Sequence, residues 1–127
     1  MMKKIDKVFL IDDDTINNYI SENIIKKSGY TDAVNIFLNG QDAWHTIENS
    51  SENPGLILVD INMPVMDGLE FLEQYSNSGK DDSVIYLMHT SPLTTEQSNR
   101  LKNLPVKGSL LKPLTKEKFQ TIVEKHF

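Results

Sequence analysis

Short apolar runs alternate along the chain with longer amphipathic stretches, and this alternation predicts five strands that are each followed by a helix. The expected strands are residues 8–11, 33–37, 56–59, 84–88 and 108–111. The first and third runs are apolar at every position, as expected of strands buried on both faces of a parallel sheet. Five strand-then-helix units with right-handed crossovers predict an α/β fold with helices on both faces of the sheet.

The first helix is predicted from one stripe of apolar residues at the spacing i, i+3, i+4 and i+8, which is typical of a helix side that faces the core. The stripe consists of Ile16, Tyr19, Ile20 and Ile24. Gly29 is placed to end this helix, because glycine adopts the left-handed conformation that is common just beyond a helix.

Four further helices are expected, one after each remaining strand. They are predicted around residues 43–47, from residue 69 onwards, over residues 94–104 and from residue 115 to the C-terminus. The last begins with Thr115 as its N-cap, and Glu117 gives it a start similar to a capping box. With 127 residues and no repeat or linker, we expect a single domain over residues 1–127.

Composition narrows the functional classes. With 39% hydrophobic and 24% charged residues, the chain has the composition of a globular protein, and no apolar run approaches the roughly 18 residues of a membrane helix. The net charge of −5 argues against nucleic acid or an anionic membrane as the main partner. The lack of cysteine excludes disulfides and thiolate catalysis. Because no signal-peptide core follows the N-terminus, we expect a cytoplasmic protein.

Polar and charged residues follow four of the predicted strands, and parallel α/β sheets bind ligands at the carboxyl ends of their strands. These residues are Asp12, Asp13, Asp14, Asp60, His89, Thr90 and Lys112. Converging carboxylates repel one another, so a hard divalent cation such as Mg²⁺, which prefers oxygen ligands, is expected among them. Lys112 adds a compact positive charge that can pair with Asp60 or with a phosphoryl oxygen.

Three segments resemble the signature segments of the receiver domain of two-component response regulators. They are LIDDD at residues 10–14, VDINMPVMDG at residues 59–68 and LKPL at residues 111–114. The middle segment is the most specific, because an acid that ends an apolar strand and is followed by this pattern is rare by chance. The resemblance covers essentially the whole chain and implies a stand-alone, chemotaxis-regulator-like receiver with a flavodoxin-like (βα)5 fold and the strand order 2-1-3-4-5.

The resemblance also implies roles for single residues. Asp60 is expected to be the phosphoacceptor, which takes a phosphoryl group from the phosphohistidine of a histidine kinase or histidine phosphotransfer protein. Mg²⁺ is expected to bind Asp60, Asp13 and the backbone carbonyl of Asn62, with Asp12 acting mainly through metal-bound water. Lys112 is expected to hold the phosphoryl oxygens, and its bond to Pro113 is expected to be cis.

Two positions depart from the family pattern. Counting from Asp60 without gaps puts the switch hydroxyl at Thr90, whereas alignment on the preceding apolar run puts His89 there. We expect Thr90, because a hydroxyl can donate to the phosphoryl group without bulk or charge. Ser109 occupies a position where receivers commonly carry an aromatic residue, so aromatic rotamer signalling is not expected.

The main hypothesis is therefore a phosphorylatable switch in a phosphorelay. We do not expect an enzyme with its own substrate, and at most we expect slow self-dephosphorylation. Phosphorylation is expected to change the loop after the fourth strand and the helix over residues 94–104, where a downstream protein then binds. The output is expected to run through protein contacts or onward phosphotransfer, with no nucleic acid and no membrane as partner. A weak homodimer is compatible with the sequence.

Two other hypotheses belong to different classes. The first is a phosphatase similar to haloacid dehalogenases, which use an aspartate nucleophile and begin with D-x-D-x-T after the first strand. Residues 12–16 nearly match this motif, but Thr15 lies one position early and the later acidic motif is not found. The second is a receiver-like docking module that has lost phosphorylation, against which Asp13, Asp60 and Lys112 are all retained.

Overall fold

The computed structural model describes residues 4–50 and 53–127, and strands alternate with helices through them as the sequence predicts. The strands are β1 (Val8–Ile11), β2 (Val34–Phe37), β3 (Leu56–Asp60), β4 (Val84–His89) and β5 (Gly108–Leu111). The helices are α1 (Thr15–Lys27), α2 (Gly40–Glu48), α3 (Gly68–Asn77), α4 (Thr95–Leu101) and α5 (Lys116–His126). Within the described ranges, none of these helices is long and apolar enough to cross a membrane.

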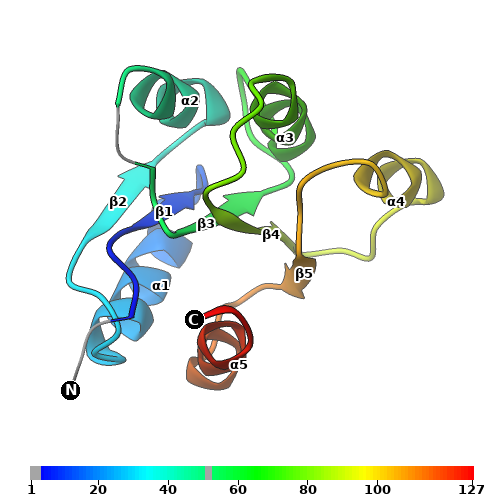
Figure 1. The fold of residues 1–127 in the computed structure, drawn as a ribbon. Helices are drawn as coiled ribbons and strands as arrows, with labels where there is room; N and C mark the ends of the chain where they lie inside the picture. Colours follow the sequence, from blue (N-terminus) through cyan, green and yellow to red (C-terminus); the bar gives the residue numbers. More distant parts are fainter. Residues whose placement is uncertain (1–3, 51–52) are drawn as a thin grey trace.

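The five strands form one parallel sheet in the order β2-β1-β3-β4-β5, which confirms the order implied by the resemblance. Figure 1 shows α1 and α5 on one face of the sheet and α2 and α3 on the other, with α4 beside the β4–β5 end. Because all strands run in the same direction, their carboxyl ends meet at one edge. The loops that follow β1, β3, β4 and β5 therefore lie along this edge, where α/β sheets bind their ligands.

Side chains of β3 alternate between the two layers of the core. Ile57 and Val59 pack with α2 and α3, whereas Leu56 and Leu58 pack with α1 and α5. All five residues of β3 are buried, which is why the run before the terminal acid has to be apolar without interruption. Packing of β3 on both faces of the sheet thus fixes the position of Asp60 at the sheet edge.

The prediction of α1 as a helix is confirmed, but its predicted buried side is wrong at three of four residues, because of the stripe only Ile24 packs partly buried against the core. Ile16, Tyr19 and Ile20 are 73%, 67% and 43% exposed. The buried residues of α1 are Asn18, Ser21 and Ile25. The physical reason lies at the start of the helix, where the side-chain amide of Asn18 donates to the Asp12 carbonyl at 2.8 Å and holds that side of α1 against the end of β1.

The helix ends follow the predicted signals with two corrections. Gly29 has the expected positive φ, 81°, and Thr115 caps α5 by accepting from the Lys118 amide at 3.1 Å. Glu117 does not complete a capping box, because the third residue of α5 is Lys118 and Glu117 lies one position too early to reach back. Reciprocal capping boxes are formed instead by Asp67 with Glu70 and by Thr94 with Gln97.

α4 is shorter than predicted and ends at Leu101 instead of Leu104. None of its residues is fully buried, because its sequence offers too few apolar positions to form a side that packs against the sheet. The strand bounds differ from the predicted ones by one residue at β2, β3 and β4. The longer β3 and β4 include Asp60 and His89 within the sheet.

Candidate functional site

Three charged residues from separate strands point to the same side of the sheet edge. Asp12, Asp60 and Lys112 each follow by two residues a leucine of the α1 and α5 layer. These leucines are Leu10, Leu58 and Leu110, respectively. Because side chains alternate along a strand, a residue two positions further on points to the same face. The strand periodicity therefore brings the three charges together.

Lys112 lies between two carboxylates. Its Nζ is 2.7 Å from Asp12 Oδ2 and 3.2 Å from Asp60 Oδ1. The pairing with Asp60 was expected from the sequence, whereas the shorter contact with Asp12 was not. Asp12 is fully buried, and the side chains of Asp60 and Lys112 are 8% and 10% exposed. Both ion pairs of Lys112 are thus largely shielded from water. Such buried ion pairs are screened far less than ion pairs at the surface.

Asp12, Asp13 and Asp60 form an acidic cluster in which one oxygen of each carboxylate lies within 4.8 Å of the others. The Asp12 carboxylate also accepts from the Asp14 amide at 3.0 Å and from the Asn17 side chain at 2.8 Å. With Lys112 as a third donor, Asp12 is fixed in place, whereas Asp13 is exposed. Sequence reasoning missed Asn17, whose position in the first turn of α1 was the available signal.

The cluster shifts the ionisation of its members. Burial, followed by the charge of Asp12, raises the pKa of Asp60 from 3.8 to about 6; Lys112 opposes this rise and Asp13 adds to it. Burial alone would lower the pKa of Lys112, but its hydrogen bonds and charge interactions with Asp12 and Asp60 outweigh burial and raise it. The site therefore holds crowded negative charge that one lysine offsets only in part. A hard cation with oxygen ligands fits this donor set.

The loop after β3 is held close to Asp60. The Ile61 amide donates to the Met88 carbonyl at 2.9 Å, and the Gly68 amide donates to the Ile61 carbonyl at 3.1 Å. A Cβ on Gly68 would lie 2.4 Å from the Asp60 carbonyl oxygen, so only glycine fits at the start of α3. Asn62, the remaining predicted metal ligand, is exposed in this loop two residues after Asp60.

The sheet register bears on the two candidates for the switch position. Asp60 pairs with Met88 in the sheet. The residue two positions after Met88 therefore points to the same side as Asp60, whereas the residue one position after Met88 points to the opposite side. Thr90 has the matching position, and it is exposed just after β4. His89 lies on the other side, with its Nδ1 2.8 Å from the Ser91 carbonyl oxygen. The geometry favours Thr90.

The β5 end of the site contains the predicted cis peptide bond between Lys112 and Pro113, which is confirmed. The Lys112 amide donates to the His89 carbonyl at 2.8 Å and continues the pairing of β5 with β4 for one residue. Ser109 is exposed on β5.

Comparison with known proteins places this site in context. A family model described as the response regulator receiver domain matches residues 8–124. The two-component response regulator ORR41 of Oryza sativa subsp. japonica is 28% identical over 132 residues, covering 98% of this chain and 97% of the regulator. Histidine kinase 5 of Arabidopsis thaliana is 33% identical over 82 residues, which are 62% of this chain and 8% of the kinase.

Among solved structures, the two-component response regulator from Cytophaga hutchinsonii has the same fold. Its TM-score is 0.86 at 26% sequence identity, and the match covers 97% of both chains.

Proposed function

Because the chain belongs to the family of response regulator receiver domains, we propose that Asp60 is its phosphoacceptor. The chain is a receiver domain of a two-component response regulator, and its function is to accept a phosphoryl group. The observation that carries the assignment to Asp60 is its position at the end of β3, where its carboxylate lies 3.2 Å from the Lys112 ammonium and within 4.8 Å of carboxylate oxygens of Asp12 and Asp13.

In the proposed step, an Asp60 carboxylate oxygen attacks the phosphorus atom of a phosphohistidine. The bond between phosphorus and the imidazole nitrogen breaks, and its electron pair stays with the imidazole. The product is an acyl phosphate on Asp60. Lys112, 3.2 Å from Asp60 in the unphosphorylated protein, offsets the charge of the incoming phosphoryl oxygens. Thr90 donates a hydrogen bond to one of them.

The acidic cluster is the proposed Mg²⁺ site. Asp13 and Asp60, which belong to this cluster, would provide carboxylate oxygens, and Asn62 would provide its backbone carbonyl. Asp12 already accepts three hydrogen bonds, from Asp14, Asn17 and Lys112, so we assign it a role through metal-bound water. When bound, Mg²⁺ supplies positive charge that stabilises the transferring phosphoryl oxygens.

The proposed donor is a histidine kinase or a histidine phosphotransfer protein. Histidine kinases are among the relatives that contain a segment similar to this chain. In this proposal the chain has no separate substrate and hydrolyses its own acyl phosphate only slowly. The proposed location is the cytoplasm. A weak homodimer and the lack of a nucleic-acid or membrane partner stay predictions from the sequence.

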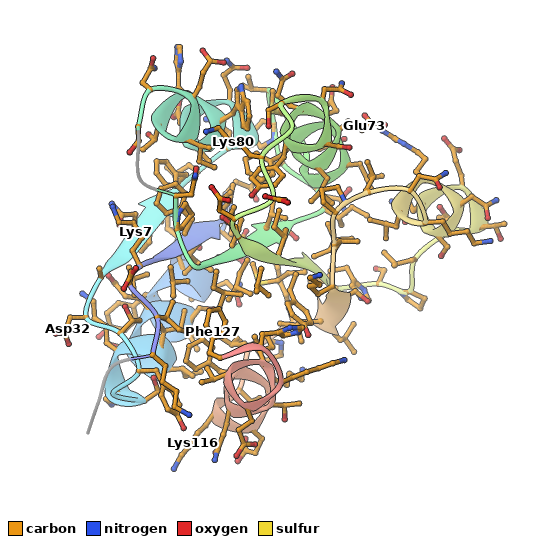
Figure 2. All side chains as sticks on the ribbon, viewed as in Figure 1. Lys7, Asp32, Glu73, Lys80, Lys116 and Phe127 are labelled. Atoms are coloured by element: carbon orange, nitrogen blue, oxygen red, sulfur yellow. The ribbon has the colours of Figure 1, made fainter. Side chains whose placement is uncertain are left out.

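The proposed output surface is the loop after β4 together with α4. α4 has no fully buried residue, so a shift of this helix exposes little of the core. Glu73 on α3 points toward α4 (Figure 2), and its carboxylate lies 3.0 Å from Arg100. The acyl phosphate carries about −1.5 to −2 charges beside this region, in place of the single charge of the carboxylate. The altered loop and helix are then the surface that a downstream protein binds.

Incubation with Mg²⁺ and acetyl phosphate tests the proposal, with intact mass as the measurement. The wild-type chain should gain the mass of one phosphoryl group, and Asp60→Asn should gain none. Asp67→Asn is the matched control, because asparagine keeps the N-cap of α3 and the residue lies outside the acidic cluster. A gain that persists in Asp60→Asn contradicts the assignment.

A second assay separates this proposal from the phosphatase hypothesis. Turnover of a phosphate ester that Asp12→Asn abolishes and Asp60→Asn leaves unchanged would support the phosphatase. We expect no such turnover, because the Asp12 side chain is fully buried and its carboxylate already accepts from three donors, so it is not exposed to a substrate.

A further inference from the structure

Lys118 contacts the backbone on both sides of Lys112. From the first turn of α5, its Nζ donates to the Leu111 carbonyl at 2.5 Å and to the Pro113 carbonyl at 3.1 Å. These two carbonyls belong to the residues immediately before and after Lys112. One ammonium group thus holds the segment from which the Lys112 side chain extends.

This contact occurs where the sheet no longer fixes the backbone. The Lys112 amide makes the last described bond between the β5 end and β4, to the His89 carbonyl. β5 is an edge strand, and in the described part of the chain no further strand lies on its other side. The Leu111 and Pro113 carbonyls accept from Lys118, which takes the place that a neighbouring strand would have.

A lysine in the first helical turn is electrostatically unfavourable. The N-terminal end of a helix carries a partial positive charge that favours acidic side chains and disfavours cations. Lys118 is the third residue of α5, so helix stability does not account for it. Its contacts with two carbonyl dipoles offset this unfavourable position.

We propose that Lys118 is a positioning residue for phosphoryl transfer: by holding the Leu111 and Pro113 carbonyls, it keeps the Lys112 ammonium between Asp60 and Asp12. Lys112 reaches both carboxylates through a flexible four-carbon chain, so the position of its backbone decides where its charge lies. Charge that is displaced by about 1 Å from a transferring group can cost up to about 100-fold in rate. This inference rests on the proposed function.

The test compares the rates of Mg²⁺-dependent phosphorylation by acetyl phosphate in single variants. Lys118→Met keeps the length of the side chain but removes its donors, and we expect a rate about 10- to 100-fold lower. Lys118→Arg restores donors for both carbonyls and should recover most of the rate. Lys116→Met is the matched control, because Lys116 lies in the same helical turn and extends from α5 away from the sheet (Figure 2).

A double-mutant cycle shows whether Lys118 acts through Lys112. In a Lys112→Met background, Lys118→Met should cause little further loss of rate, because the group it positions is gone. An equal loss in both backgrounds overturns the proposal, and so does a Lys118→Met rate equal to that of Lys116→Met. Thermal unfolding is measured in parallel with Lys118→Gln as a second variant. A large loss of stability in both Lys118→Met and Lys118→Gln would identify Lys118 as a structural residue and would also overturn the proposal.

Failure of this inference is distinct from failure of the proposed function. If the wild-type chain gains no phosphoryl group, or gains one that does not depend on Asp60, the phosphoacceptor assignment is wrong. If phosphorylation depends on Asp60 and Lys112 but not on Lys118, only the positioning role is wrong.

Discussion

Asp60 loses most of its contact with water at the end of β3. Burial, then the charge of Asp12, raises its pKa from 3.8 to about 6, against the opposing effect of Lys112. In the unfolded chain the pKa of Asp60 has its ordinary value, so the folded protein binds the proton of this carboxyl group more tightly. The stability that the proton provides is fully present below about pH 3.8 and is lost as the pH rises through about 6.

Asp60→Asn should therefore stabilise the protein at neutral pH. Asparagine removes the buried negative charge, and we expect the free energy of unfolding to rise by about 1 to 2 kcal/mol at pH 7.5. Near pH 4 the two proteins should differ little, because Asp60 is protonated in the folded wild type. Urea unfolding at pH 4, 5.5 and 7.5 in the presence of a chelator measures the difference. A variant that is less stable at pH 7.5 contradicts this account of Asp60.

Val65 has an unusual backbone conformation in the loop after β3. Its φ is 70°, and the Met66 amide donates to the Pro64 carbonyl at 2.8 Å across it, which makes a three-residue turn. A β-branched residue is disfavoured there because of its Cβ. The side chain is 77% exposed, so little packing compensates for the strain. The loop that follows Asp60 thus contains a strained residue.

Val65→Gly should raise the free energy of unfolding by about 0.5 to 1 kcal/mol. Relief of strain is worth about 1 to 3 kcal/mol, and the greater entropy of glycine in the unfolded chain offsets part of this gain. Val65→Ala is the control, because alanine keeps the Cβ and should recover less. Chemical denaturation of the three proteins under one set of conditions gives the comparison. An equal gain from alanine and glycine would show that the β-branch, and not the positive φ, is the source of the strain.

Among the elements, α1 shows most clearly where periodicity stops being informative. Three of the four residues of its apolar stripe are exposed, whereas Asn18 and Ser21 are buried. We expect Ile16→Ser and Tyr19→Ser each to change the free energy of unfolding by less than about 0.5 kcal/mol. Ile25→Ala should lower it by about 2 to 5 kcal/mol, because Ile25 is fully buried. Urea unfolding of the three variants decides, and a large loss from Ile16→Ser contradicts the observed rotation of α1.

The strands could be predicted because each depends on a local pattern, whereas their order was implied by the resemblance to receiver domains. A run such as Val8–Ile11 indicates a doubly buried strand wherever it occurs, and the signature segments around Asp60 and Lys112 indicate the topology. The rotation of α1 could not be predicted in this way, because it depends on the Asn18 amide meeting a carbonyl at the end of β1. Helix periodicity shows which residues share a side but not which side the neighbours cover.

The same distinction holds within the site. The closeness of Asp12, Asp60 and Lys112 follows from the sequence, because parallel strands end at one edge and side chains alternate along them. The contacts of Asn17 and Lys118 did not follow, since each depends on the side-chain conformation of a residue in a helix. Such supporting contacts require coordinates.

At the scale of the whole molecule, the charge distribution couples the site to stability. The chain has a net charge of −5, and three of its carboxylates are gathered within 4.8 Å at one edge of the sheet. Unfolding separates these carboxylates, so a divalent cation binds the folded chain more tightly than the unfolded one. A ligand with this preference stabilises the folded state by about 1.4 kcal/mol at ten times its Kd.

Mg²⁺ should therefore raise the Tm of the wild-type protein by about 3 to 5 °C at ten times its Kd. Asp13→Asn should lose most of this increment, because it removes an exposed carboxylate of the cluster. Asp14→Asn is the matched control, since it removes the same charge one residue further on and asparagine can still cap α1 through Ile16 and Asn17. Thermal unfolding with and without Mg²⁺, at constant ionic strength, measures both variants. Equal losses in the two would show that Mg²⁺ only screens the net charge, whereas a loss confined to Asp13→Asn requires a site at the cluster.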